Sequence, residues 1–373
     1  MTDTPLTQVP PMPVPPVSSV SPVSPELARL PKSAGVWAQA WKRLKADRVG
    51  MVSLGVTLLF IGLVVLAQLG LVGKNWQKEV GAPFAPPHFV GKAAVSSQAA
   101  TLDRIEGAAV DMSDVDPLAP RYKEWGERAA RFKTTDTVKS DTLPLGGDQL
   151  GRDVLSKVIK GAQVSITVGL AAALFATLIG TILGAVGGYF GGPVGDFLEW
   201  VYNVFTAIPY ILLVFALAAV LKSGPLAGTL GSGVWTVVII LSLVGWTGIY
   251  RLVRAEYMKH RAREYVLAAE AIGASHTARM FTHILPNISH VVLVQLSLHV
   301  VSFIKAEVIL SYLGLGVPLD MVSWGTMLAE AQTELVQGKW WQLVAATTFM
   351  AAFVTAFALL TDALRDALDP KLR

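Results

Sequence analysis

The side chains that most often perform chemistry in proteins are sparse in this chain and are not arranged for it. There is no cysteine, so disulfides, iron–sulfur clusters and thiol nucleophiles are excluded. A glycine-rich run, GAVGGYFGGPVGD, lacks the lysine–hydroxyl pair of a nucleotide-binding loop, so the chain itself is expected neither to hydrolyse ATP nor to hold a cofactor. The histidines do not form a metal-binding cluster, and no metal site is expected; they stand at positions 88, 260, 276, 283, 290 and 299.

One charged, histidine-containing segment interrupts the apolar second half of the chain: EYVLAAEAIGASHTARMFTHILPN, residues 264–287. Gly273 stands where the C-terminus of a helix needs a left-handed residue. Ser275 supplies a side-chain oxygen suited to capping the helix that follows. That helix, at about residues 276–285, is predicted to stop or bend at Pro286, which cannot continue the ladder of backbone hydrogen bonds.

The predicted helix is amphipathic and short. Phe281 and Leu285, like Met280 and Ile284, lie four residues apart and share one side, whereas the side with His276, Thr277 and Arg279 is expected to face solvent. Isolated helices below about 12–15 residues rarely persist in water, so the apolar side needs a partner. The small residues before the turn, which include Ala268 and Ala269, would let another protein's surface approach closely.

The surrounding elements are predicted to be membrane-spanning helices. Of the 373 residues, 53% are hydrophobic and 16% are charged, against about 25% charged residues in a soluble domain. Six stretches are apolar over almost their whole length and approach or exceed the roughly 17–25 residues that cross a bilayer as helix. They are residues 51–72, 164–190, 197–221, 235–250, 288–313 and 341–360. The chain is therefore predicted to be an all-α integral membrane protein.

Lysine and arginine in the short loops predict the orientation. Basic residues crowd the start of the first span, the loop at 251–287 between spans four and five, and the end of the chain. Both termini and that loop are therefore expected in the cytoplasm, and the long stretch 73–161 outside. Because these basic residues flank spans instead of forming a stripe, the net charge of +4 does not indicate a nucleic-acid partner.

The chain divides into four parts by composition. Residues 1–35 are rich in proline and are predicted to be a disordered cytoplasmic tail, and 36–73 hold an interfacial helix and the first span. Residues 74–142 are predicted to form an external insert, and 143–373 a membrane core with the other five spans. A helix with one apolar side is expected along the outer membrane surface just before the second span.

The cytoplasmic segment resembles the signature loop of ABC importer permeases. Ala268, Ala269, Gly273, Leu285 and Pro286 match that signature, although Leu267 and His283 replace its usual glutamate and isoleucine. In that family the helix after the glycine docks into a cleft of a cytoplasmic ATPase subunit. The resemblance therefore implies that these five residues, together with Ser275, Arg279 and Phe281, couple the chain to an ATPase.

Further motifs resemble the second-permease branch of the dipeptide, oligopeptide and nickel importers. The external LGGDQLGRDVLSKV is similar to a motif of that branch through Gly147, Asp148, Gly151, Arg152 and Asp153. The stretches AEVILSYLGLG, SWGTML and DALRDALDPKLR resemble three more of its motifs. The resemblance implies the six-helix type I importer fold, also called MetI-like, and runs from about residue 41 to the end, apart from the insert.

The function implied by this resemblance is that of a transmembrane permease subunit of a bacterial inner-membrane importer for peptides or a related small solute. Its implied partners are a second homologous permease in a heterodimer, two cytoplasmic ATPases that bind ATP and magnesium, a periplasmic solute-binding protein, and membrane lipid. An ion-driven secondary transporter is the closer alternative. An intramembrane protease would need a serine–histidine or paired-aspartate arrangement within the spans, which is not evident.

Three residues within the predicted spans are candidates for the pathway or for packing. Glu307 is an ionisable group inside span five, and leaving it in lipid is costly, so it is expected to face inward. Asn203 and Pro209 in span three are expected to mark a bend, either along the pathway or as a kink within the bundle.

Overall fold

The computed structural model describes residues 36–91, 118, 121–131, 139–223, 233–318 and 320–368. The predicted disordered tail at 1–35 and about half of the predicted insert at 74–142 lie outside these ranges. The helices are α1 (Val36–Ala46), α2 (Arg48–Gln68), α3 (Tyr122–Arg131), α4 (Val154–Phe190), α5 (Gly192–Thr206), α6 (Tyr210–Ser223), α8 (Val234–Arg261), α9 (Glu264–Ala271), α10 (His276–Ala278), η3 (Arg279–Ile284), α11 (Leu285–Tyr312), α12 (Trp324–Val336) and α13 (Trp341–Leu368).

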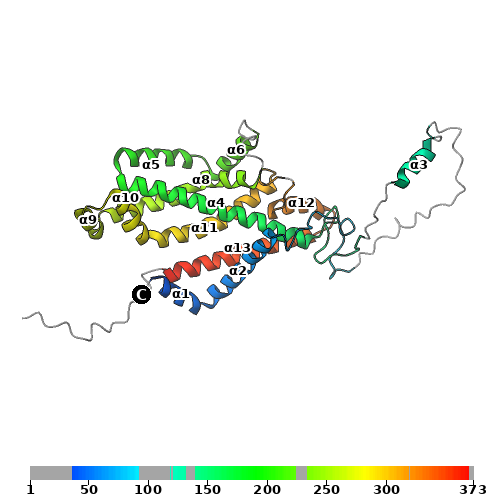
Figure 1. The fold of residues 1–373 in the computed structure, drawn as a ribbon, viewed down its shortest axis with the longest axis horizontal. Coiled ribbons are helices and arrows are strands. Elements are labelled where there is room, and N and C mark those ends of the chain that lie inside the picture. The colour runs from blue at the N-terminus through cyan, green and yellow to red at the C-terminus, as the bar shows by residue number, and fades with distance from the viewer. Residues whose placement is uncertain are drawn as a thin grey trace, which may run out of the picture.

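Long helices dominate the described part of the chain, which contains no strand beyond isolated β-bridges. Among the described residues, five helical segments are long and apolar enough to cross a membrane, or six if the bent pair α5–α6 counts as one span. In Figure 1, α4, α8 and α11 run side by side, and α2 lies against α13. The segment α9–α10 lies at the same end of the bundle as α1 and the C-terminal end of α13, whereas α12 lies at the other end.

A row of glycines on α4 brings α4 and α8 into close contact. A Cβ atom at Gly180 would lie 2.5 Å from the carbonyl oxygen of Trp246, one at Gly184 2.7 Å from that of Tyr250, and one at Gly188 2.5 Å from that of Arg254. Small residues at every fourth position let helix backbones approach closely in a membrane, where van der Waals contact replaces the hydrophobic effect as the attraction between helices. The pair α4–α8 therefore forms the tightly packed centre of the bundle.

The second span is longer than predicted, and the prediction of a separate surface helix before it is wrong. A single helix of 37 residues runs from Val154 to Phe190, capped at its start by Asp153. Gly161, between the two predicted helices, lies within this helix without breaking it, and Val154 and Val158 are buried in the main core. Tertiary burial of this apolar side replaces the predicted contact with the membrane surface.

The third span is broken, which agrees with the bend expected at Asn203 and Pro209. The prediction of a single helix over 197–221 is wrong. Helices α5 and α6 meet at an angle of 88°. Helix α5 ends at Thr206, and Pro209 directly precedes α6, where its missing N–H costs no hydrogen bond. Asn203 and Pro209 are both exposed, so these residues mark a bend on the surface of this chain.

Span five and the predicted cytoplasmic helix form one continuous helix, so of the two predicted outcomes at Pro286, a stop or a bend, the stop does not occur. Helices α10, η3 and α11 follow one another without a loop and together give a 37-residue segment. Residues Arg279–Ile284 adopt π-helical hydrogen bonding. Pro286, the second residue of α11, therefore stands at the junction of two hydrogen-bonding patterns, where a missing donor is tolerated.

Candidate functional site

The turn between α9 and α10 has the predicted geometry. Gly273 has a φ of +88°. Its N–H donates to the carbonyl of Glu270 at 2.9 Å, and the N–H of Ala274 donates to that of Ala269 at 2.9 Å. These two bonds form a Schellman motif, which terminates a helix with a left-handed residue. Ser275 then caps α10 by accepting a hydrogen bond from the N–H of Ala278 at 3.2 Å.

Arg279 is buried, so the prediction that it faces solvent is wrong. One guanidinium nitrogen lies 2.7 Å from a carboxylate oxygen of Glu270, and the other lies 2.9 Å from Nδ1 of His276. Its guanidinium also lies 5.8 Å from the ring centre of Tyr189, near the end of α4. Sequence patterns alone do not identify Glu270 and Tyr189 as part of this site, because they meet Arg279 only through the fold. Arg279 thus fastens the start of α10–η3 to both α9 and α4.

Only part of the predicted apolar side is available to a partner. Met280 and Ile284 are buried in a cluster with Ile249, Val253 and Tyr257 of α8. The hydroxyl of Tyr257 donates to the carbonyl of Met280 at 3.0 Å, which satisfies an acceptor of the π-helical turn. The chain's own α8 therefore supplies the apolar partner that the sequence pattern predicted for these two residues.

The remaining apolar residues form an exposed surface at the tip of this segment, which we call the coupling surface: Leu267, Ile272 and Phe281. Ile272 is 86% exposed and Phe281 43% exposed. Among the other predicted coupling residues, Ala268 and Pro286 are exposed, Leu285 is half-buried, and Ala269 is buried. Large exposed apolar side chains next to a rigid turn are typical of a protein–protein contact.

The motif predicted to be external is organised around Asp148, whose carboxylate is completely buried. One oxygen accepts from the N–H groups of Leu150 and Arg152, each at 2.9 Å. The other accepts from Nε of Arg152 at 2.6 Å and from Nζ of Lys157 at 2.8 Å. Burial by itself raises the pKa of Asp148, but the Lys157 ammonium and these hydrogen bonds outweigh it and hold the pKa below its ordinary value.

The other predicted motif residues shape the loop around this carboxylate. Asp153 caps α4 by accepting from the N–H of Ser156 at 3.0 Å. Gly151 has a φ of +77°, and a Cβ there would lie 2.1 Å from the carbonyl oxygen of Gly81. The carbonyl of Gly147 accepts from the indole of Trp341 at 2.7 Å. The motif thus joins the start of α4 to the start of α13 and to the loop at 79–88.

Lys157 connects this motif to α12 and α13. Its ammonium contacts Asp148 and Glu330, and it donates to the side-chain oxygen of Gln342 at 3.2 Å. The amide nitrogen of Gln342 donates to Glu330 at 3.1 Å. In the sequence, Lys157 is visible only as a replacement for the arginine usual in the resembling motif, and its partners Glu330 and Gln342 lie more than 170 positions away. Spacing within a motif does not reveal contacts at that separation.

A second carboxyl group, that of Glu334 on α12, is buried beside this cluster. One of its oxygens accepts from the N–H of Gln149 at 3.2 Å, and the other has no hydrogen-bond partner in the part of the chain that the structure describes. Burial raises its pKa to about 7. Between about pH 4.5, the ordinary value, and pH 7, the folded protein therefore retains a proton that the unfolded chain releases.

This proton predicts how stability depends on pH. The free energy of unfolding should fall as the pH rises from 4.5 to 7, by at most about 1.4 kcal/mol per pH unit from this group. The Glu334→Gln variant keeps the shape of the side chain but removes its titratable group. We expect the stability of this variant to depend less on pH, measured as the thermal unfolding midpoint in detergent at several pH values. Parallel curves for the two proteins would show that Glu334 does not retain the proton.

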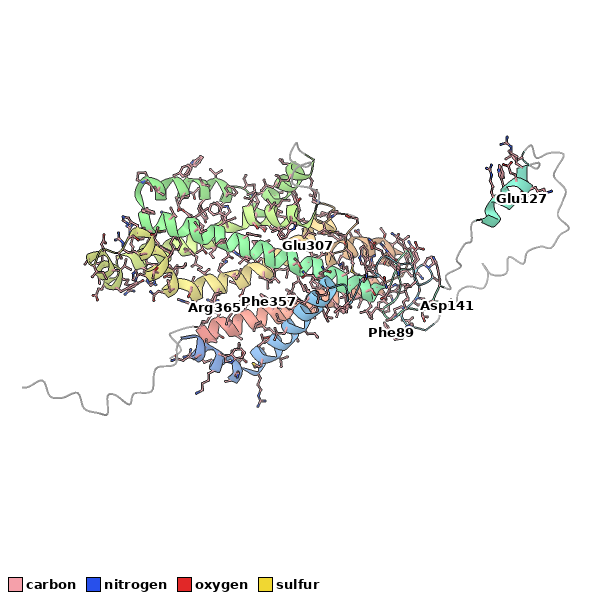
Figure 2. The ribbon with its side chains drawn as sticks, in the orientation of Figure 1. Phe89, Glu127, Asp141, Glu307, Phe357 and Arg365 are labelled. Carbon is pink, nitrogen blue, oxygen red and sulfur yellow. The ribbon has the colours of Figure 1, made fainter. Side chains whose placement is uncertain are left out.

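Glu307 is fully buried near the middle of the bundle, as expected for an inward-facing residue (Figure 2). The hydroxyl of Ser311 donates to its carboxylate at 2.6 Å and accepts from the N–H of Val317 at 3.2 Å. Glu307 thereby holds the turn that follows α11. These contacts favour the packing role over the pathway role for this residue.

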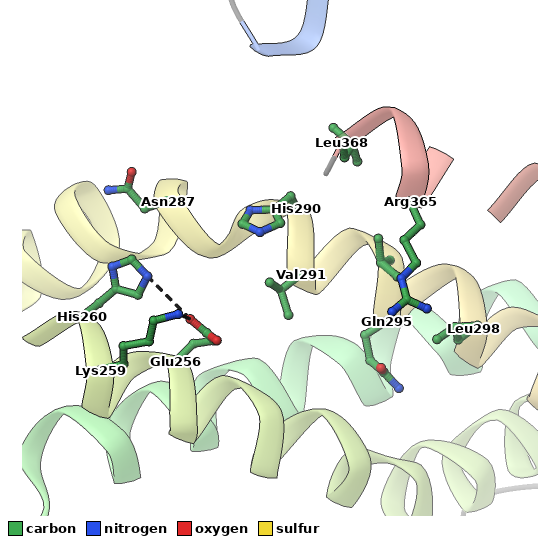
Figure 3. Close-up of a pocket in the computed structure, with 11 residues that line it drawn as sticks. Glu256, Lys259, His260, Asn287, His290, Val291, Gln295, Leu298, Arg365 and Leu368 are labelled. Carbon is green, nitrogen blue, oxygen red and sulfur yellow. Dashed lines mark hydrogen bonds and ion pairs between the residues drawn. The ribbon is translucent and has the colours of Figure 1, made fainter. Parts of the chain in front are cut away.

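A cavity of about 560 Å³ opens between α8, α11 and α13 at the end of the bundle that carries the coupling surface (Figure 3). Glu256, Lys259 and Arg365 lie around it, and Glu256 pairs with Lys259 at 3.2 Å. Deeper in the bundle the cavity reaches Gln295, whose amide nitrogen lies 3.2 Å from Nε2 of His299. Polar groups inside a span, next to a cavity, are unusual and mark candidate contacts for a solute.

Together, the bundle of spans, the exposed coupling surface and the cavity define a multi-pass membrane permease. Two family models match the chain: the binding-protein-dependent transport system inner membrane component over residues 166–373, and the N-terminal transmembrane domain of oligopeptide transport permease C over residues 35–87. The chain belongs to the first family, and it is a transmembrane permease subunit of an ABC importer, located in the inner membrane.

Characterised relatives agree with this assignment. The dipeptide transport system permease protein of Bacillus subtilis is 33% identical over 334 residues, which cover 90% of this chain and 85% of the relative. An oligopeptide transport system permease protein of the same organism is 36% identical and covers 65% of this chain and 78% of the relative. The glutathione transport system permease protein of Salmonella typhimurium is 40% identical over 61% of this chain and 72% of the relative.

Proposed function

We propose that this chain imports peptides as one half of a permease heterodimer, together with two cytoplasmic ATPases and an external solute-binding protein. The second half would be a homologous permease. ATP and magnesium would be bound by the ATPases alone, and this chain would bind no cofactor. The coupling surface and both termini would lie in the cytoplasm, and the Asp148 motif outside.

The observation that carries the proposal is the mechanical continuity between the coupling surface and the bundle. The π-helical turn that carries Phe281 continues directly into α11. Arg279 and Met280 fasten the same turn to α9, α4 and α8. A displacement of Phe281 by an ATPase would therefore move α11 as a rigid body relative to α13, along the cavity shown in Figure 3.

The proposed peptide substrate rests on the relatives, whose names specify dipeptides, oligopeptides and glutathione. The polar pair Gln295–His299 at the inner end of the cavity supports it, because amide and imidazole groups can bond the backbone of a peptide. The relevant measurement is uptake of a radiolabelled dipeptide and tripeptide by cells that carry or lack this chain. Uptake that persists after loss of the ATPases would favour an ion-driven transporter.

The coupling role is tested by Phe281→Glu, which places a charge in the centre of the coupling surface. We expect the variant to enter the membrane in normal amounts but to lose co-purification with the ATPases. Val336→Glu is a matched control, because Val336 is 87% exposed and is the last residue of α12, a helix at the opposite end of the bundle. Equal recovery of ATPase with Phe281→Glu and with the control would exclude this surface as the contact.

A further inference from the structure

A surface groove of about 650 Å³ lies between α2 and α13, apart from the coupling surface and the cavity of Figure 3. This volume is in the range of pockets that hold a ligand of a few hundred daltons. Helices α2 and α13 lie side by side in Figure 1. The groove is lined by Arg48, Val49, Val52, Ser53, Val56, Ala351, Ala352, Thr355, Ala356 and Leu359.

The lining changes from charged to apolar along the helices. Arg48, the first residue of α2, is at one end, and every other lining residue is apolar or carries only a hydroxyl. The hydroxyl of Ser53 is bonded within its own helix, to the carbonyl of Gly50 at 2.9 Å. From Arg48 to Val56 the groove follows eight helical steps, or about 12 Å. That length is comparable to one leaflet of the hydrocarbon core, about 15 Å.

The residues around the charged end of the groove are of the types found at a membrane surface. Helix α1 packs there through Ala40 and Leu44 against the end of α13. Trp41 on α1 is 48% exposed, and Nζ of Lys45 lies 5.2 Å from its ring centre. An exposed tryptophan beside lysines is typical of a helix that lies among lipid headgroups. The carboxylate of Asp47, next to Arg48, is engaged in capping α2.

We propose that this groove binds one anionic glycerophospholipid. The phosphate would contact the guanidinium of Arg48, with Lys45 nearby, and one acyl chain would lie along Val52, Val56 and Ala352. An arginine followed by a wholly apolar groove of one leaflet's depth complements the charge distribution of such a lipid. A peptide in extended form does not fit, because its backbone groups would find no hydrogen-bond partners along the apolar walls.

The test compares lipid retention by the assembled transporter in detergent, using native mass spectrometry with added dioleoyl-phosphatidylglycerol or dioleoyl-phosphatidylcholine. Arg48→Gln should reduce the preference for phosphatidylglycerol about fivefold, the effect of one basic residue at a membrane surface. Arg365→Gln, at the same end of the bundle but outside the groove, should retain the preference. No preference in the wild type, or equal loss in the two variants, would overturn the proposal.

A second variant separates the acyl contact from the charge. Ala352→Phe fills the groove and should reduce retention of both lipids, whereas Val344→Phe, at an exposed position of α13 outside the groove, should not. A photoreactive amino acid at Val52 then identifies the occupant in membranes. Attachment of one phospholipid is the expected product. Attachment to another polypeptide would show that a protein helix covers the groove, and would refute lipid binding there.

Discussion

Replacing Gly273 by valine is expected to lower solute uptake by roughly five- to 150-fold while the protein still enters the membrane. A β-branched residue is strongly disfavoured at a φ of +88°. Strain of this kind costs on the order of 1–3 kcal/mol, which lowers the population of the ordered turn by about five- to 150-fold. The measurements are uptake and ATPase stimulation in proteoliposomes, with membrane insertion checked by immunoblot.

The chain offers a closely matched control for this variant at Gly338. It also terminates a helix, with a φ of +77°. Its N–H donates to the carbonyl of Leu335 at 2.9 Å, and the next N–H donates to that of Glu334 at 3.0 Å, as around Gly273. No atom lies within 4 Å of a Cβ built at either glycine, so neither variant introduces a clash. Equal loss of uptake in Gly338→Val would mean that strain in any such turn impairs the protein, and would remove the support for a special role of Gly273.

Replacing Asp148 by alanine is expected to destabilise the folded protein by about 3–5 kcal/mol, the cost of breaking a buried ion pair. The change leaves the buried ammonium of Lys157 without one of its two carboxylates and the N–H groups of Leu150 and Arg152 without their acceptor. We expect the thermal unfolding midpoint in detergent to fall by on the order of 10 °C.

An exposed ion pair in the loops near Asp148 provides the comparison. Lys139 and Glu79 lie 3.0 Å apart, with side chains 40% and 52% exposed. Lys139→Ala should therefore change stability by only about 0–1 kcal/mol. The double variant Asp148→Asn, Lys157→Gln should be less destabilised than the sum of its single variants, because it removes the unpaired ammonium together with the carboxylate. Similar midpoints for Asp148→Ala and Lys139→Ala would contradict the burial argument.

The sequence predicted well those features that depend on neighbouring residues. Hydropathy located the spans, and Gly273 and Ser275 perform the capping roles that their types and spacing indicated. Local patterns were less successful where they placed residues on a helix face. Arg279 is polar and was expected in solvent, but Glu270, His276 and Tyr189 surround it. A hydrophobic pattern shows that Met280 and Ile284 must be buried, but does not distinguish the chain's own α8 from a partner.

The class of protein was therefore determined by the sequence alone, because the length and apolar character of a span and the capping of a helix are set within about twenty neighbouring residues. The tertiary structure decided which residues act together. The cluster of Asp148, Lys157, Glu330 and Gln342 joins positions up to 194 apart in the chain, and the raised pKa of Glu334 exists only because the folded chain buries that carboxyl beside Gln149. Burial and charge pairing are properties of the packed bundle, so they follow from the arrangement of helices and not from any one segment.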